Sequence, residues 1–175
     1  MEARRSDRPF AIVGEGSIFD GIAYWATLLG VYLMVGGLMF YSGWDKLVHD
    51  DGNAPQGVKD QFKGTFISHF PGTDAAWIIL GILEFAVFVI LVASLVRLEF
   101  LPHRTKSLLQ VGLAVAMLTF ACLAFGQTAT KQFAGTASLY TYFGSTVVIL
   151  ILVGLMPPYR PDRWLGGTED SIRRR

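Results

Sequence analysis

A single acidic residue, Glu84, lies inside an otherwise apolar run, LGILEFAVFV, at residues 80–89. A carboxylate in such a run can carry a proton, bind a cation or contact a quinone. It can equally serve as a hydrogen-bonding or ion-pairing node between helices. An acid near the centre of a bilayer costs roughly 2.5–3.5 kcal/mol on the insertion scale, so we expect Glu84 to face the interior of a helix bundle.

Two hydroxyl residues at a suitable depth are candidate partners of Glu84. Ser42 lies near the end of the preceding apolar run, and Thr119 lies within the following one. With Glu84 they form the predicted intramembrane polar node. Lys46 is a further candidate if the first helix continues past Trp44. The structural and the functional interpretation of Glu84 both stay open at this point.

A second polar cluster is predicted at the outer mouth of the bundle. Asp45 and Lys46 follow the first apolar run, Gln127 lies near the end of the third, and Tyr140 lies early in the fourth. Such a mixture of polar and aromatic side chains suits a quinone head group. The alternative is an ordinary set of polar helix ends that face water.

Asp45, His49 and His69 carry side chains that suit a divalent metal ion such as zinc or copper. The first two are spaced i, i+4, so they share a face if the first helix includes both. The alternative is a solvated polar loop, because a metal site needs three or four converging ligands. Haem is not expected, since no histidine lies inside an apolar run.

Four long apolar segments must position these residues, and each can cross a ~30 Å hydrocarbon core as a helix. They cover residues 21–43, 74–96, 107–128 and 136–156. Hydrophobic residues make up 52% of the 175-residue chain, and its charges gather between the apolar runs. We therefore predict an all-α, integral membrane four-helix bundle. The net charge of +1 gives no indication of nucleic-acid binding, and the single cysteine excludes an intramolecular disulfide.

Basic residues predict the orientation of the four spans. Most of them lie in the N-terminal tail (residues 1–20), in the link between the second and third spans, and in the basic C-terminal tail (residues 158–175). The positive-inside rule then places both termini in the cytoplasm, with the chain spanning a plasma membrane of the bacterial inner-membrane type. We expect five basic residues at the lipid head groups, namely Arg97, Arg104, Lys106, Arg160 and Arg163.

The 21–157 transmembrane domain contains one long outer loop, residues 44–73. Within it, Val58, Phe62, Phe66 and Phe70 are spaced four apart. This spacing predicts a short amphipathic helix with one apolar face. We expect that face to pack on the bundle, and contact with lipid or with a partner protein is the alternative.

Two short motifs resemble those of the DoxX family of small four-helix membrane proteins. The first apolar run ends in a Ser-Gly-x-x-Lys-Leu pattern, here Ser42, Gly43, Lys46 and Leu47. The second apolar run carries Gly-x-x-Glu, here Gly81 and Glu84. The resemblance covers residues 30–156, whereas the long outer loop and the Arg-rich C-terminal tail follow no family pattern.

The resemblance implies an accessory subunit of a membrane oxidoreductase or respiratory complex. Its partners would be membrane lipids and other membrane subunits, and the family's links to quinone-coupled sulfur oxidation imply a quinone contact. Two alternatives stay open. One is a small transporter or a proton- or ion-conducting protein that uses Glu84, although few polar residues line the spans. The other is a metal-binding membrane enzyme subunit that uses Asp45, His49 and His69.

Overall fold

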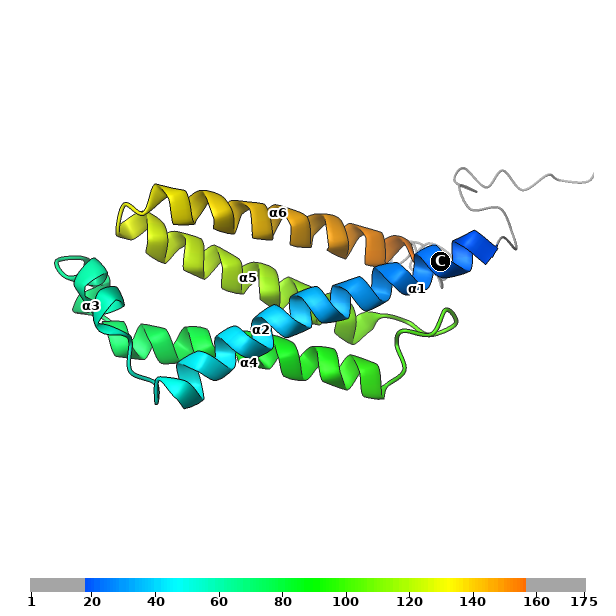
Figure 1. The fold of residues 1–175 in the computed structure, drawn as a ribbon, viewed down its shortest axis with the longest axis horizontal. Helices are drawn as coiled ribbons and strands as arrows, with labels where there is room; N and C mark the ends of the chain where they lie inside the picture. The colour runs from blue at the N-terminus through cyan, green and yellow to red at the C-terminus, as the bar shows by residue number, and fades with distance from the viewer. Residues whose placement is uncertain (1–17, 157–175) are drawn as a thin grey trace, which may run out of the picture.

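The computed structural model describes residues 18–156, whose regular structure is entirely helical (Figure 1). The α-helices are α1 (Ile18–Val31), α2 (Gly37–Trp44), α3 (Gln56–Phe62), α4 (Thr73–Val96), α5 (Ser107–Ala129) and α6 (Phe133–Leu155). Two π-helical turns, η1 (Tyr32–Gly36) and η2 (Asp45–His49), join α1 to α2 and extend α2, and a 3-10 turn, η3 (Phe66–Ser68), follows α3. The predicted tails lie outside these residues, apart from residues 18–20, which belong to α1.

Four helices are long and apolar enough to cross a membrane, which confirms the predicted all-α architecture. They are Gly21–His49, Thr73–Val96, Ser107–Ala129 and Phe133–Leu155. The first helix runs six residues beyond its predicted end at residue 43. The backbone N–H of Asp50 donates to the carbonyl oxygen of Asp45 over 2.8 Å, so the helix closes with a π-type bond. The charges after Trp44 suggested an end to the span, but the structure turns Lys46 into the protein.

The outer loop contains the predicted short helix, α3, but this helix ends at Phe62. The predicted single face through Phe66 and Phe70 is therefore wrong. Lys63 has an extended ψ of 124°, and Gly64 has a φ of +82°, which is the left-handed region that favours glycine. The chain consequently turns away from the α3 axis before it reaches the next phenylalanine.

Two phenylalanines of the loop do pack on the bundle, both against α5. A Cβ placed on Gly126 would lie 3.4 Å from the Phe62 ring, and the rings of Phe66 and Phe125 have centroids 6.0 Å apart. Phe70 in contrast is 81% exposed. The loop therefore rests on the C-terminal end of α5.

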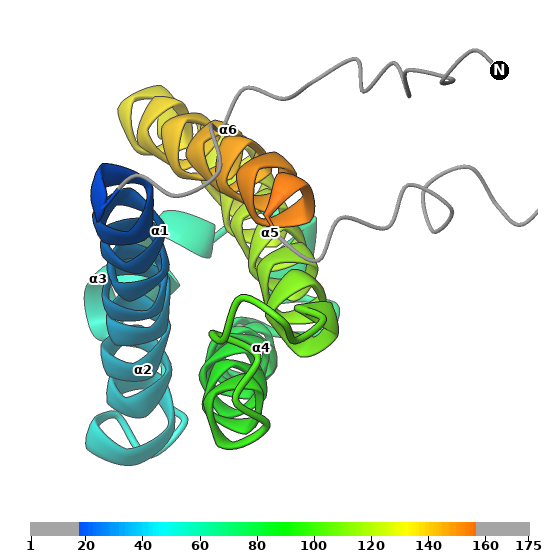
Figure 2. The same cartoon turned by 90° about the vertical axis from the view of Figure 1, so that its right-hand side faces the viewer.

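The spans pack in the order first helix, α4, α5, α6, and Figure 2 looks along the bundle that they form. Their shared core draws on all four, and its fully buried side chains include Leu28, Met39, Val87, Leu91, Leu109, Leu113 and Val153. Burial is uneven. In the most apolar window of each span, 39% of α5 is buried but only 11% of α6. Because α6 packs mainly against α5, most of its surface stays open.

The first helix and α4 cross at two glycines. A Cβ on Gly43 would lie 2.8 Å from the backbone nitrogen of Phe85 and 3.1 Å from the carbonyl oxygen of Gly81. A Cβ on Gly81 would lie 3.0 Å from the Cβ of Lys46. Small residues of this kind let membrane helices approach backbone to backbone. The crossing therefore fixes how far Lys46 stands from Glu84.

Gly43→Ala should destabilise the protein by about 1–3 kcal/mol, because its methyl group would overlap backbone atoms that cannot move aside. The measurement is reversible unfolding in mixed micelles as the SDS fraction rises. Gly37→Ala is the matched control, since a Cβ there meets nothing within 4 Å. Equal losses in the two variants would contradict a glycine-dependent crossing.

Candidate functional site

A buried ion pair lies between the first helix and α4. The Nζ of Lys46 is 2.8 Å from the Oε2 of Glu84, and the two side chains are only 9% and 2% exposed. Glu84 sits close to the middle of the 24-residue α4. Each charge is therefore neutralised by the other at a depth where neither would be solvated by water.

Lys46 has further partners besides Glu84. Its ammonium donates to the Oγ of Ser42 over 2.7 Å and also lies 3.3 Å from the Ser42 carbonyl oxygen. The ring centroid of Trp77 is 4.9 Å from the same nitrogen, within the range of a cation–π contact. The Ser42 hydroxyl on the first helix and the Glu84 carboxylate and Trp77 ring on α4 surround the ammonium group. Both helices therefore stabilise its charge.

This geometry favours the structural interpretation of Glu84. A proton carrier needs a carboxylate that can change its partners, whereas Glu84 is held in a salt bridge at a glycine crossing. A proton moving through Glu84 would first have to break that bridge and leave the ammonium of Lys46 buried and unpaired. The pair instead joins two helices far apart in the sequence.

The predicted polar node is brought together only in part. Ser42 joins Glu84 through Lys46. Thr119 is fully buried, but its hydroxyl donates to the carbonyl oxygen of Val115 in its own helix over 2.9 Å. Thr119 therefore satisfies its hydrogen bond locally, as threonines in helices commonly do.

The predicted outer-mouth cluster is not one site. Asp45 is exposed on η2, while Lys46 turns inward to Glu84. On the other side of the bundle, Gln127 packs on Gly135, where a Cβ would lie 2.8 Å from its Oε1. Tyr140 lines a separate groove between α5 and α6. The four residues do not meet because the first helix continues past Trp44 and Lys46 then pairs with Glu84, the alternative that the sequence also offered.

The three metal-ligand candidates do not converge either. Across residues 18–156, no three His, Cys, Asp or Glu side chains come together as a metal site would require. Asp45 and His49 are exposed on η2, and His69 makes local contacts through its Nδ1, 3.1 Å from the Oγ of Ser68 and 3.3 Å from the carbonyl oxygen of Thr65. The hypothesis of a site built from Asp45, His49 and His69 is therefore wrong.

The basic residues expected at the head groups differ in exposure. Arg97 and Arg104 are exposed in the link between α4 and α5, whereas Arg160 and Arg163 lie outside the described residues. Lys106 is only 6% exposed, and its Nζ lies 5.4 Å from the ring centroid of Tyr24. It is therefore packed into the protein and does not extend to the lipid surface.

Glu99 is a buried acid that the sequence analysis missed. One carboxylate oxygen accepts a hydrogen bond from the backbone N–H of Leu108 (3.1 Å). The other accepts one from the backbone N–H of Leu109 (3.0 Å) and one from the hydroxyl of Ser94 (3.0 Å). The hydroxyls of Ser94 and Tyr32 are hydrogen-bonded at 2.8 Å. Glu99 thus satisfies free N–H groups at the start of α5 and links α5 to α4 and the first helix.

The charge of Glu99 also acts on the nearby Lys106. Burial lowers the pKa of Lys106, and the negative charge of Glu99 offsets part of that effect by raising it. The one local signal for Glu99 was its place a few residues before the start of α5, where an acid suits the positive end of a helix.

The chain matches no family model, no curated protein and no solved structure. The resemblance to the DoxX family therefore rests on its two short motifs. The structure brings the residues of these motifs to one place, with the glycines at the helix crossing and Lys46 paired to Glu84.

Replacing one member of the buried pair should be more harmful than replacing both. Glu84→Met or Lys46→Met leaves an unpaired buried charge and should destabilise the protein by about 3–5 kcal/mol, whereas the double variant should lose much less. Unfolding in SDS mixed micelles measures all four proteins of the double-mutant cycle. Additive losses would show that the two side chains are not coupled.

Proposed function

We propose that this protein is a DoxX-like accessory subunit of a membrane oxidoreductase or respiratory complex. In this proposal it binds other membrane subunits through its helices, and the catalytic groups belong to those partners. The observation that carries the proposal is the open surface of α6, the least buried of the four spans.

The open surface of α6 has an unusual composition for a face that meets only lipid. Besides large aliphatic and aromatic residues it exposes small and hydroxyl side chains, which define here the free face of α6: Ala134, Ala137, Ser138, Thr141, Gly144 and Ser145. Such residues are enriched where membrane helices pack against each other. The composition therefore supports a protein partner on this side of the molecule.

The polar interior supports the same proposal. Among the described residues, every buried side-chain nitrogen and oxygen atom has a hydrogen-bond partner. The Lys46–Glu84 pair and the Glu99 cluster use their polar groups to hold helices together. These contacts fix the first helix, α4 and α5, and α6 packs on α5, so the three fixed helices form a support for the free face of α6.

Mutations on the free face should separate partner binding from folding. A Cβ on Gly144 meets nothing within 4 Å, so Gly144→Leu adds bulk outside the chain's own packing. We expect the variant to fold but to lose most of its partner subunits. Gly21→Leu, at another open glycine on the first helix, should keep them.

The measurement is mild detergent extraction at native expression levels, followed by mass spectrometry of the co-purifying proteins. Redox subunits present in stoichiometric amounts with the unchanged chain, and lost on Gly144→Leu, are the expected result. A chain that purifies alone would contradict the accessory role. Partners retained by Gly144→Leu but lost on Gly21→Leu would place the contact on the first helix instead.

We further propose that the protein spans a plasma membrane and that both termini lie in the cytoplasm. Most basic residues lie in the two tails and in the link between the second and third spans, and such residues are enriched on the cytoplasmic side. A cysteine at Gln61, in the outer loop, should react with a membrane-impermeant thiol reagent in intact cells. A cysteine at His103, between α4 and α5, should react only after permeabilisation. Both positions are exposed, and the reverse labelling pattern would invert the topology.

A further inference from the structure

A short strap, residues 50–54, follows the first helix on the way to α3 and contacts the N-terminal end of α4 (Figure 1). At its start, the Oδ2 of Asp50 accepts a hydrogen bond from the indole Nε1 of Trp77 over 3.2 Å. At its end, the backbone N–H of Ala54 donates to the Oδ1 of Asp74 over 2.9 Å. The strap is therefore bonded to the first turns of α4 at two points.

Gly52, in the middle of the strap, lets the chain lie directly on α4. It has a φ of +72°, which favours glycine, and a Cβ there would lie 2.9 Å from the Cγ1 of Ile78. Its backbone N–H donates to the carbonyl oxygen of Lys46 over 3.0 Å. The strap is thus also bonded to the residue of the first helix that forms the buried ion pair.

Trp77 lies between the strap and this ion pair. Its indole donates to Asp50 in the strap, and its ring centroid is 4.9 Å from the Nζ of Lys46. Gly81 and Glu84 follow Trp77 on one face of α4, so Glu84 is about 10 Å further along the helix. Trp77 itself is half-buried, whereas the paired side chains are 9% and 2% exposed. The ring therefore covers the ion pair on the side of the strap.

Water is available at the strap, because residues 50–72 lie between two candidate spans and outside both. Water that reaches an ion pair solvates its two charges separately and weakens their attraction. We propose that the strap and Trp77 form a closure over the Lys46–Glu84 pair. Lifting the outer loop from α4 opens this closure, admits water and loosens the crossing of the first helix with α4. The outer loop thereby regulates the crossing, and this role goes beyond the proposed function because it requires no partner subunit.

The test measures how fast a water-soluble acetylating reagent, sulfosuccinimidyl acetate, modifies each lysine of the full-length protein in nanodiscs. Mass spectrometry quantifies acetylation at each position over time. Lys63 is exposed and gives the rate of an open lysine. We expect Lys46 of the unchanged protein to react at least ~100-fold more slowly, because its amine must first leave a buried salt bridge.

Three variants separate the cover from the strap. Trp77→Ala removes the ring over the ammonium and should speed the acetylation of Lys46 at least ~10-fold. Asp50→Ala removes only the bond to the strap and should speed it about fivefold, the effect of one ordinary hydrogen bond. Trp77→Phe keeps a ring but loses the same bond, so it should match Asp50→Ala. The double variant Asp50→Ala/Trp77→Phe should then be no faster than either single variant.

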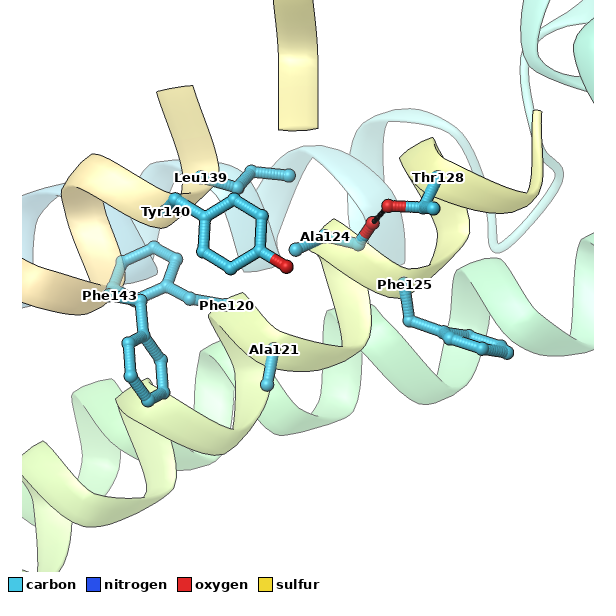
Figure 3. A pocket seen from close by; sticks show the side chains of 8 residues that line it. All are labelled: Phe120, Ala121, Ala124, Phe125, Thr128, Leu139, Tyr140 and Phe143. Atoms are coloured by element: carbon cyan, nitrogen blue, oxygen red, sulfur yellow. Dashed lines mark hydrogen bonds between the residues drawn. The ribbon is translucent and has the colours of Figure 1, made fainter. Parts of the chain in front are cut away.

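The matched controls change the same types of residue elsewhere. Trp44→Ala and Asp45→Ala alter exposed side chains of the first helix close to Lys46 in the sequence. Tyr140→Ala removes a ring from the groove that lies between α5 and α6, on the other pair of helices (Figure 3). All three should leave the acetylation rate of Lys46 unchanged.

Lys106, which is buried at the opposite end of the bundle, reports loosening of the whole protein. A variant in which Lys46 and Lys106 both react faster would overturn the inference, as would a Lys46 that reacts as fast as Lys63 in the unchanged protein. Equal rates in Trp77→Ala and Trp44→Ala would show that Trp77 is no cover. An Asp50→Ala variant without effect would show that the strap does not control the cover, and the coupling of the loop to the ion pair would be wrong.

Discussion

A buried ion pair holds the first helix against α4. The Nζ of Lys46 lies 2.8 Å from the Oε2 of Glu84. Removing two charges from water is unfavourable, and only a close, well-aligned contact between the ammonium and the carboxylate offsets that cost. Gly43 and Gly81 provide it by letting the two backbones touch. The π-helical turn η2 carries the first helix far enough to place Lys46 above its partner. Crossing, turn and ion pair therefore depend on one another.

The opposite end of the bundle is held by a second buried acid. Glu99 accepts the N–H groups at the start of α5 and the hydroxyl of Ser94, which in turn bonds Tyr32. The Glu99 cluster thus ties the first helix, α4 and α5 together, whereas the Lys46–Glu84 pair ties the first helix to α4. α6 takes part in neither cluster and packs mainly on α5. This asymmetry divides the molecule into a fixed part and a helix with an open surface.

The open side of the molecule is where the proposed interactions lie. The free face of α6 exposes small and hydroxyl residues of the kind that pack against another membrane helix. This face does not include Glu84, the residue that first suggested chemistry. The position of this intramembrane acid is explained by helix packing, and the proposed contact with a partner lies on the surface of α6.

The sequence alone determined the all-α architecture and the four spans, because a ~30 Å apolar core requires long runs of apolar residues. It also determined that Glu84 must face inward, since its charge is unfavourable in lipid. Only the tertiary structure decided that Lys46, 38 residues away in the chain, is its partner, and that Asp45, His49 and His69 do not converge. Likewise, the burial of Glu99 depends on Ser94 and the start of α5 meeting in space. The composition of one segment shows whether it can form a helix surrounded by lipid. Which side chains of two helices pair depends on where the helices cross. No short stretch of the sequence contains that information.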